Sequence, residues 1–249
     1  MIQLNNITKV FNRGEVNEVK ALKDVSLKIG EGEFVVLVGA NGSGKTTLLN
    51  VIAGAVLPSE GAVLLHGEEA TRLPEYKRSR WVARVFQDPL GGTAPELSIL
   101  DNFRLAALRT QRKKLKIGID EAFKKSVREK IAGLGLGLEA KLQQPMGTLS
   151  GGQRQALTLL MSVMDHTDIL LLDEPTAALD PKSADVVLLT AERLIREYKL
   201  TTVLITHNMR ETQRFGTRLI QMERGRMVRD LEGEAKQELK LEEMYGWFG

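Results

Sequence analysis

A glycine-rich segment near the beginning of the chain has the residue types that hold phosphate. It reads Gly39-Ala40-Asn41-Gly42-Ser43-Gly44-Lys45-Thr46, here called the phosphate loop, and Thr47 follows it. Glycines allow tight turns that point several N–H groups into one concavity, and the positive end of a following helix adds to their potential. Lys45 would reach the β- and γ-phosphates, and the Thr46 hydroxyl would bind Mg²⁺. The segment therefore predicts a nucleotide site rather than a flexible loop with a solvated lysine.

Two carboxylates and a histidine follow apolar runs farther along the chain. Asp173 and Glu174 come after Ile169–Leu172, and His207 comes after Thr201–Thr206. In open α/β sheets, ligands bind beyond the carboxyl ends of the strands. Surface acids before a turn are the alternative for the two carboxylates, and a phosphate loop elsewhere in the chain makes that alternative the less favoured one. For His207, a structural and a functional role remain equally open.

The phosphate loop requires a strand before it and a helix after it, and the sequence supplies both. Phe34–Val38 is an apolar run that predicts a buried strand, and the residues from Gly44 to Gly54 favour a helix. Ile2–Val10 and Ala21–Ile29 alternate apolar with polar residues, which is typical of half-buried strands in a small antiparallel layer. Phe11 follows the first of these strands, and its spacing favours a core position over an aromatic platform for a purine ring.

The middle of the chain changes from strand to helical periodicity. Val82–Phe86 predicts a strand that ends at Gln87, and Asp88–Pro95 is rich in residues that break regular structure. From residue 98 to about 137 the apolar spacing is helical, which predicts a helical insertion lobe. Within it, the basic run Arg109–Lys116 favours a solvated face, with an anionic membrane surface or a partner as the alternative.

The sequence Leu149-Ser150-Gly151-Gly152-Gln153 predicts the start of another helix. Ser150 is a favourable N-cap, and Gln155–Met164 contains strong helix formers. The N-terminus of this helix is therefore a second candidate anion site. The remaining predicted elements are a helix from Pro181 to about Tyr198, a hairpin over Leu219–Asp230, and a helical tail over Glu232–Gly249 with Trp247 and Phe248 at its tip.

Composition excludes several classes of protein. The 249 residues accommodate one large domain or a domain with a lobe. With 35 basic and 32 acidic residues, the net charge of +3 lacks the basic footprint of nucleic-acid-binding proteins. The absence of cysteine excludes disulfides and thiolate metal sites and is compatible with a reducing cytoplasm. No apolar run approaches the roughly 18 residues that predict a membrane span.

Taken in order, these motifs resemble the nucleotide-binding subunit of ABC transporters over nearly the whole chain. Within that superfamily the chain resembles the ATPases of bacterial uptake systems that work with a tryptophan/tyrosine-type substrate-binding protein and a separate permease. The stretches that carry this narrower resemblance are Thr8–Asn12, Val85–Pro89, Gly92–Ala94, Leu149–Leu160 and Thr206–Met209.

The resemblance implies an α/β fold of the P-loop NTPase type, with a RecA-like core, an antiparallel β layer and a helical insertion subdomain. It implies a single ABC ATPase domain over residues 1–249. Residues 1–90 and 165–230 would form the catalytic core with the β layer, and residues 96–164 the helical signature subdomain. Residues 231–249 would form a C-terminal helical tail.

The resemblance also implies a role for each site residue. Phe11 matches the aromatic residue that stacks on adenine, although tyrosine is commoner there. Glu174 matches the general base and His207 the γ-phosphate sensor, and Asp173 matches the acid beside the metal. The other matches are the phosphate loop with Lys45, Thr46 and Thr47; Gln87, which contacts Mg²⁺ or the attacking water; Asp180, at the dimer interface; and Ser150, Gly151, Gly152 and Gln153, the signature that caps ATP held by the other subunit.

The function implied is hydrolysis of ATP with Mg²⁺ by a dimer of this chain, driving uptake of a solute, an amino acid or a related small molecule. The partners would be a second copy, a membrane permease and, indirectly, a solute-binding protein, but no nucleic acid. The chain would lie in the cytoplasm, on the inner face of the cell membrane. The alternatives are a soluble ABC ATPase without a transport role, an exporter subunit and a regulatory subunit without turnover.

Overall fold

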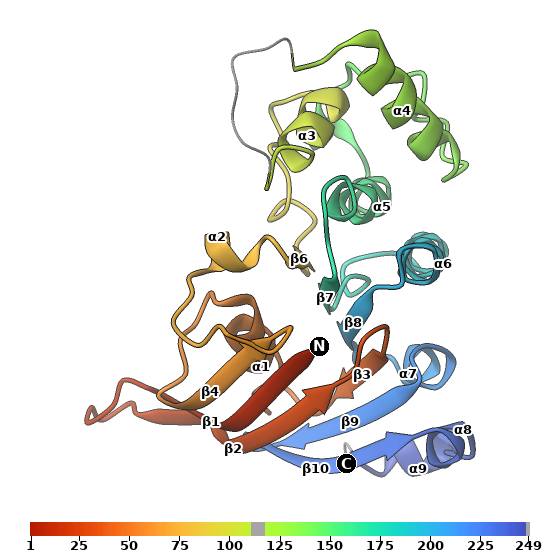
Figure 1. The fold of residues 1–249 in the computed structure, drawn as a ribbon. Helices are drawn as coiled ribbons and strands as arrows, with labels where there is room; N and C mark the ends of the chain where they lie inside the picture. Colours follow the sequence, from red (N-terminus) through yellow and green to blue (C-terminus); the bar gives the residue numbers. More distant parts are fainter. Residues whose placement is uncertain (111–117, 248–249) are drawn as a thin grey trace. The chain divides into compact units, whose positions relative to one another are not determined.

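The structure is a computed structural model in which residues 1–110 and 118–247 are described (Figure 1). The chain forms two compact units. The first unit contains Met1–Arg78, Leu171–Glu174 and Leu200–Gly249. The second contains Ser79–Leu170 and Pro175–Lys199. The domain boundaries given above remain a prediction.

An antiparallel sheet forms one part of the first unit. Its order is β2-β1-β4-β5, and β1 pairs with both β2 and β4. Alternate residues of β1, such as Ile2 and Leu4, are buried, as expected for a sheet with one face on the core. The predicted antiparallel layer is therefore confirmed. Its strands are β1 (Ile2–Phe11), β2 (Val19–Ile29), β4 (Glu60–Leu65) and β5 (Glu68–Glu69).

A second sheet of the first unit is built around the predicted strand before the phosphate loop. Strand β3 (Phe34–Val38) is paired in parallel with β8 (Thr201–Ile205) and with β9 (Arg218–Glu223). β10 (Arg226–Glu232) completes the predicted hairpin with β9, and β7 (Ile169–Asp173) lies next to β8. The β3 residues from Val35 onward are buried because both faces of this strand are covered.

Helix α1 (Lys45–Ala53) begins directly after the phosphate loop, as predicted. Its C-terminal end is held by Arg78, the last residue of α2 (Glu75–Arg78). The guanidinium is fully buried and donates to the carbonyl oxygens of Val51 and Ile52 at 2.7 and 2.8 Å. Burial lowers the pKa of Arg78 to about 10. A cation at the negative end of α1 stabilises the helix whose other end faces the phosphate loop.

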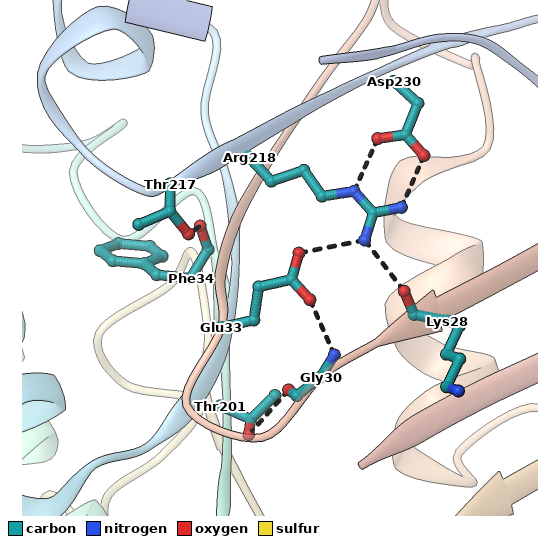
Figure 2. A network of polar contacts seen from close by, with 8 residues as sticks. All are labelled: Lys28, Gly30, Glu33, Phe34, Thr201, Thr217, Arg218 and Asp230. Atoms are coloured by element: carbon teal, nitrogen blue, oxygen red, sulfur yellow. Dashed lines mark hydrogen bonds and ion pairs between the residues drawn. The ribbon is translucent and has the colours of Figure 1, made fainter. Parts of the chain in front are cut away.

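Arg218, at the start of β9, joins the two sheets of the first unit (Figure 2). Its guanidinium forms two hydrogen bonds of 2.6 Å with the Asp230 carboxylate of β10. It also donates to Glu33 Oε1 at 3.0 Å and to the Lys28 carbonyl oxygen of β2 at 2.9 Å. The hydrogen bonds with Asp230 raise the pKa of Arg218 above its usual range. One side chain thus connects strands from both sheets.

We expect Arg218→Met to destabilise the first unit by about 2 kcal/mol, because Glu33 Oε1 and the Lys28 carbonyl lose the guanidinium that donates to them. Urea unfolding of the full chain measures this loss. The matched control is Arg226→Met, since Arg226 is an exposed arginine of the neighbouring strand β10. Equal stability of the two variants would show that the Arg218 network contributes nothing.

The C-terminal residues form two short helices, so the prediction of one continuous helical tail over 232–249 is wrong in this respect. α8 (Glu234–Gln237) and α9 (Leu241–Tyr245) are separated by Leu239, which is buried. The Leu239 carbonyl accepts a hydrogen bond from Gln213 of α7 (Met209–Arg214) at 3.4 Å. The predicted role of Phe248 lies outside the described residues.

The second unit is mainly helical, in agreement with the predicted insertion lobe. Helix α5 is almost wholly buried and contacts three other helices of the unit. In the predicted basic run, Arg109 is partly buried and donates to the His166 carbonyl at 2.7 Å, and residues 111–116 lie outside the described part. The elements are β6 (Val82–Val85), α3 (Ile99–Ala106), α4 (Glu121–Ala132), the 3₁₀ turn η1 (Met146–Thr148), α5 (Gly151–Ser162), the first residues of β7, and α6 (Pro181–Tyr198).

None of the helices formed by the described residues has the length and apolar character required to cross a membrane.

Candidate nucleotide-binding site

The phosphate loop adopts backbone conformations that glycine permits. Gly39, Gly42 and Gly44 have φ angles of 149°, 77° and 104°. A Cβ atom on Gly39 would lie 2.2 Å from the Met222 carbonyl oxygen, so a larger residue cannot fit there. The loop is also held by the β9–β10 hairpin, because the backbone N–H of Gly225 donates to the Ser43 carbonyl at 2.9 Å. The loop is therefore held at both ends by one hairpin that is distant in sequence.

Lys45 is buried at the base of the phosphate loop and is 5 % exposed. Its Nζ donates to the carbonyl oxygens of Gly39 at 2.7 Å and Ala40 at 3.0 Å. Burial lowers the pKa of Lys45, and the charges of Glu174 and Asp173 act in the opposite direction. A buried ammonium held by two neutral carbonyls is a strong candidate for binding phosphate oxygens.

Thr46 and Asp173 form a pair of oxygen donors beside Lys45. The Thr46 hydroxyl donates to Asp173 Oδ1 at 3.3 Å, and Asp173 is 6 % exposed. Hydroxyl and carboxylate oxygens are the ligands that Mg²⁺ prefers, with substrate phosphates completing its coordination. Among the described residues, no group of three or more His, Cys, Asp or Glu side chains is placed to hold a metal. The donor set therefore fits a Mg²⁺ ion that arrives with a nucleotide.

Glu174 and His207 are brought together at the ends of β7 and β8. His207 Nε2 lies 2.6 Å from Glu174 Oε1, and the Glu174 backbone N–H donates to the Ile205 carbonyl at 3.1 Å. Glu174 has a φ of 48°, a left-handed conformation that is uncommon for glutamate and is found preferentially at functional sites. The structure thus places His207 against Glu174, and a functional role for His207 stays a prediction.

A second cluster holds the backbone on both sides of His207. Thr206 donates its hydroxyl to Glu211 Oε2, and Asn208 Nδ2 donates to Glu211 Oε1 at 3.3 Å. Glu211 lies in α7 and is 7 % exposed. The cluster fixes the short connection between β8 and α7, and it was not foreseen from the sequence.

A cavity of about 510 Å³ adjoins the phosphate loop within the first unit. Phe11 lines this cavity and is only partly buried, which favours the aromatic platform over the core position. Ser43 is 4 % exposed, and in the described part of the chain its hydroxyl has no hydrogen-bond partner. A cavity beside the phosphate loop, with the Ser43 hydroxyl available as a donor, fits a nucleotide. The cavity is also lined by Lys20, Lys23, Glu174 and Arg224.

Arg224 is a cavity residue that sequence reasoning missed. It lies at the tip of the β9–β10 hairpin, with a φ of 46°, and reaches the cavity wall through the tertiary fold. The sequence predicted the hairpin but did not indicate that its tip would lie beside the phosphate loop in the folded chain. Four cations, Lys20, Lys23, Lys45 and Arg224, therefore line a cavity suited to an anionic ligand.

The other predicted site residues belong to the second unit. Ser150 is the N-cap of α5, and a capping box joins it to Gln153: the Gln153 N–H donates to Ser150 Oγ at 3.3 Å, and Gln153 Oε1 accepts from the Ser150 N–H at 3.2 Å. Asp180 is the N-cap of α6, where its carboxylate accepts from the Ser183 N–H at 3.1 Å. Gln87 is exposed after the end of β6. The roles predicted for these residues at the nucleotide remain predictions.

Close packing explains one glycine of the predicted signature. A Cβ atom on Gly152 would lie 2.5 Å from the Ser183 Cβ, so α5 and α6 can approach only with glycine at this position. Gln155, also on α5 and fully buried, donates to the Phe86 carbonyl at 2.9 Å. This bond ties α5 to the residue before Gln87, a contact that the sequence did not predict.

Comparison of the sequence with known families and proteins also indicates a nucleotide-binding protein. The sequence pattern of the family described as ABC transporter matches residues 22–177. The chain belongs to the ABC transporter family. It is 39 % identical over 246 residues to a tyrosine transport ATP-binding protein of Clostridioides difficile, covering 98 % of this chain and 97 % of that protein. It is 32 % identical to the energy-coupling factor transporter ATP-binding protein EcfA2 of Clostridium tetani, covering 95 % and 80 % of the two chains.

Comparison with solved structures also finds ABC cassettes. The ATP-binding cassette MJ0796, in a dimeric post-hydrolysis state bound to ADP and Pi, superposes with a TM-score of 0.80. The sequences are 31 % identical, and the match covers 93 % of this chain and 98 % of the other. The predicted fold class, a P-loop NTPase of the ABC ATPase type, is confirmed. The chain is an ATP-binding, ATP-hydrolysing subunit of an ABC transporter.

Proposed function

We propose that this chain hydrolyses ATP as one half of a homodimer and thereby drives uptake of an amino acid or a related small molecule through a separate permease. The observation that carries the catalytic part is the convergence of Lys45, the Thr46–Asp173 pair and the Glu174–His207 pair in one unit. The resemblance to transport proteins carries the physiological part. An exporter subunit and a soluble ABC ATPase are the alternatives.

The chemistry assigned to the first unit is in-line attack of water on the γ-phosphate. Such a reaction needs a positioned water and positive potential on the phosphate oxygens, with little covalent chemistry from the protein. Glu174 would accept the proton of the attacking water, and His207, 2.6 Å away, would orient that carboxylate and sense the γ-phosphate. Lys45 would exchange its carbonyl partners for phosphate oxygens.

Separate sets of residues would hold the metal and the nucleotide. Thr46, Asp173 and Gln87 would ligand Mg²⁺, which neutralises charge on the phosphate oxygens when it is bound. Phe11 would stack on the adenine, with the phosphate loop and Thr47 around the phosphates. Gln87 would report the state of the site to the permease.

Two copies of the chain would be needed because part of the proposed site lies in the second unit. The N-terminus of α5, a helix of 12 residues capped by Ser150, has backbone N–H groups that no carbonyl of the helix can accept from, and a positive dipole end. We propose that Ser150–Gln153 of one chain caps the γ-phosphate of ATP on the other, with Asp180 at the same interface. An ABC cassette of similar structure, MJ0796, is dimeric, which supports the homodimer.

The transport assignment draws on the relatives. The Clostridioides difficile relative is named a tyrosine transport ATP-binding protein. A relative of Enterococcus faecalis, 32 % identical, is named a methionine import ATP-binding protein. We therefore propose a membrane permease and a solute-binding protein as partners, and a location on the inner face of the cell membrane. The whole chain would form one ABC ATPase domain, with residues 96–164 as its signature subdomain and 231–249 as its tail.

Purification of the tagged chain from membranes of its own cell in mild detergent tests the transport assignment. We expect a multi-span protein and a secreted or lipid-anchored binding protein to co-purify. The Lys45→Met variant serves as a control, because assembly with a permease should not require ATP binding. Recovery of soluble or ribosomal partners alone would contradict the assignment.

A further inference from the structure

The position of His207 depends on α7, which begins two residues later. Glu211 of α7 holds both neighbours of the histidine: its carboxylate accepts from the Thr206 hydroxyl and from Asn208 Nδ2. The Asn208 N–H also donates to Thr206 Oγ1 at 3.1 Å. Glu211 therefore holds the side chains of the residues on both sides of His207.

The other end of α7 is held by the C-terminal part of the chain. Lys236 of α8 is 7 % exposed, and its Nζ donates to the carbonyl oxygens of Phe215 at 2.7 Å and Gly216 at 2.8 Å. A longer contact of 3.5 Å reaches the Gln213 carbonyl. These carbonyls lie at the end of α7, where a cation is favourable.

A continuous series of hydrogen bonds connects Lys236 to the two neighbours of His207. Phe215, whose carbonyl accepts from Lys236, donates its own N–H to the Glu211 carbonyl at 2.9 Å. Glu211 in turn holds Thr206 and Asn208. Every group in this series belongs to the first unit. The distance from the end of α7 to the histidine is thus bridged by one short helix.

Burial of a lysine ammonium is costly unless its donors are satisfied. Desolvation lowers the pKa of Lys236. A lysine that only covered the end of a surface helix could remain exposed, as Lys240 does in the same segment. The buried position is consistent with a requirement that α7 be held in one place.

We propose that Lys236 is a positioning residue for ATP hydrolysis, which sets His207 against Glu174 by fixing α7 at its C-terminal end. The proposal rests on the function assigned above to His207. It gives α8 a role that the ATP-binding residues do not explain. Release of α8 from α7 would leave ATP binding intact and slow hydrolysis.

Steady-state ATPase assays of the full chain test the proposal with four variants: Lys236→Met, Lys236→Arg, Lys240→Met and His207→Ala. We expect Lys236→Met to lower kcat by about tenfold, because small displacements of a reacting group are costly, and to leave the KM for ATP within about twofold. Lys236→Arg should recover most of the rate, since it keeps the cation. Lys240→Met should match the unsubstituted chain.

Nuclear magnetic resonance of the histidine side chains separates positioning from loss of fold. The chain has three histidines, and His207→Ala assigns the resonance of the one at the site. We expect Lys236→Met to shift the His207 imidazole resonance and to leave those of His66 and His166 in place. A general loss of structure would move all three.

The outcomes distinguish the inference from the function on which it rests. If His207→Ala hydrolyses ATP at the unsubstituted rate, the role proposed for His207 is wrong. If His207→Ala is inactive while Lys236→Met keeps both its kcat and an unshifted His207 resonance, only the role of Lys236 is overturned.

Discussion

Replacement of Glu174 by glutamine should reduce ATP hydrolysis by at least about 100-fold, the range associated with loss of a general base. The amide has nearly the shape of the carboxylate but cannot accept a proton from water. Because Glu174 lies 2.6 Å from His207 Nε2 and is largely buried, the substitution should preserve the contact with the imidazole while removing the base. Release of inorganic phosphate from saturating Mg·ATP measures the effect.

ATP binding should survive this substitution, which distinguishes a lost base from a lost site. The matched control is Glu31→Gln, an exposed glutamate of the same unit outside the cavity. We expect that variant to keep its full rate. Hydrolysis by Glu174→Gln at the unsubstituted rate would exclude Glu174 as the general base and transfer the role to another group.

Replacement of Lys45 by methionine should weaken ATP binding by about 100-fold, because two charge-assisted hydrogen bonds of about 1.5 kcal/mol each are lost. Methionine keeps most of the buried side-chain volume, so the loop should retain its packing. Titration calorimetry with a slowly hydrolysed ATP analogue measures the dissociation constant.

Lys28→Met is the control for this second substitution, since Lys28 is exposed on β2 and its ammonium points away from the Arg218 network (Figure 2). Thermal unfolding of both variants checks that the first unit remains folded. Unchanged affinity in Lys45→Met would mean that the buried ammonium does not contact the phosphates, and the nucleotide site would have to lie elsewhere in the cavity.

Local sequence patterns were sufficient for the elements that carry the phosphate loop. The apolar run Phe34–Val38 is strand β3 with unchanged bounds, and the glycines at positions 44 and 54 are the left-handed caps of α1. These features are encoded within a few residues, because strand periodicity and glycine conformation are local properties. The positions of Asp173 and Glu174 followed from the same reasoning, since Asp173 is the last residue of the buried strand β7 and Glu174 follows it.

Contacts between distant segments could not be read from the sequence. Arg78 and Lys236 each occur in a short polar segment with no sign of burial, yet both cap the carbonyl ends of helices. Arg224 reaches the cavity only because the hairpin tip folds back against the phosphate loop. Long cationic side chains have no periodic pattern that identifies their partners, so their roles appear only in the folded structure.

Light scattering of Glu174→Gln with Mg·ATP or Mg·ADP tests most directly the claim that two copies of this chain close around ATP. The account predicts a mass twice that of one chain with ATP, and the mass of a single chain with ADP, because only the γ-phosphate would be capped by the partner. A single-chain mass with saturating ATP, in a variant shown to bind it, would contradict the dimer and the assignment of Ser150–Gln153.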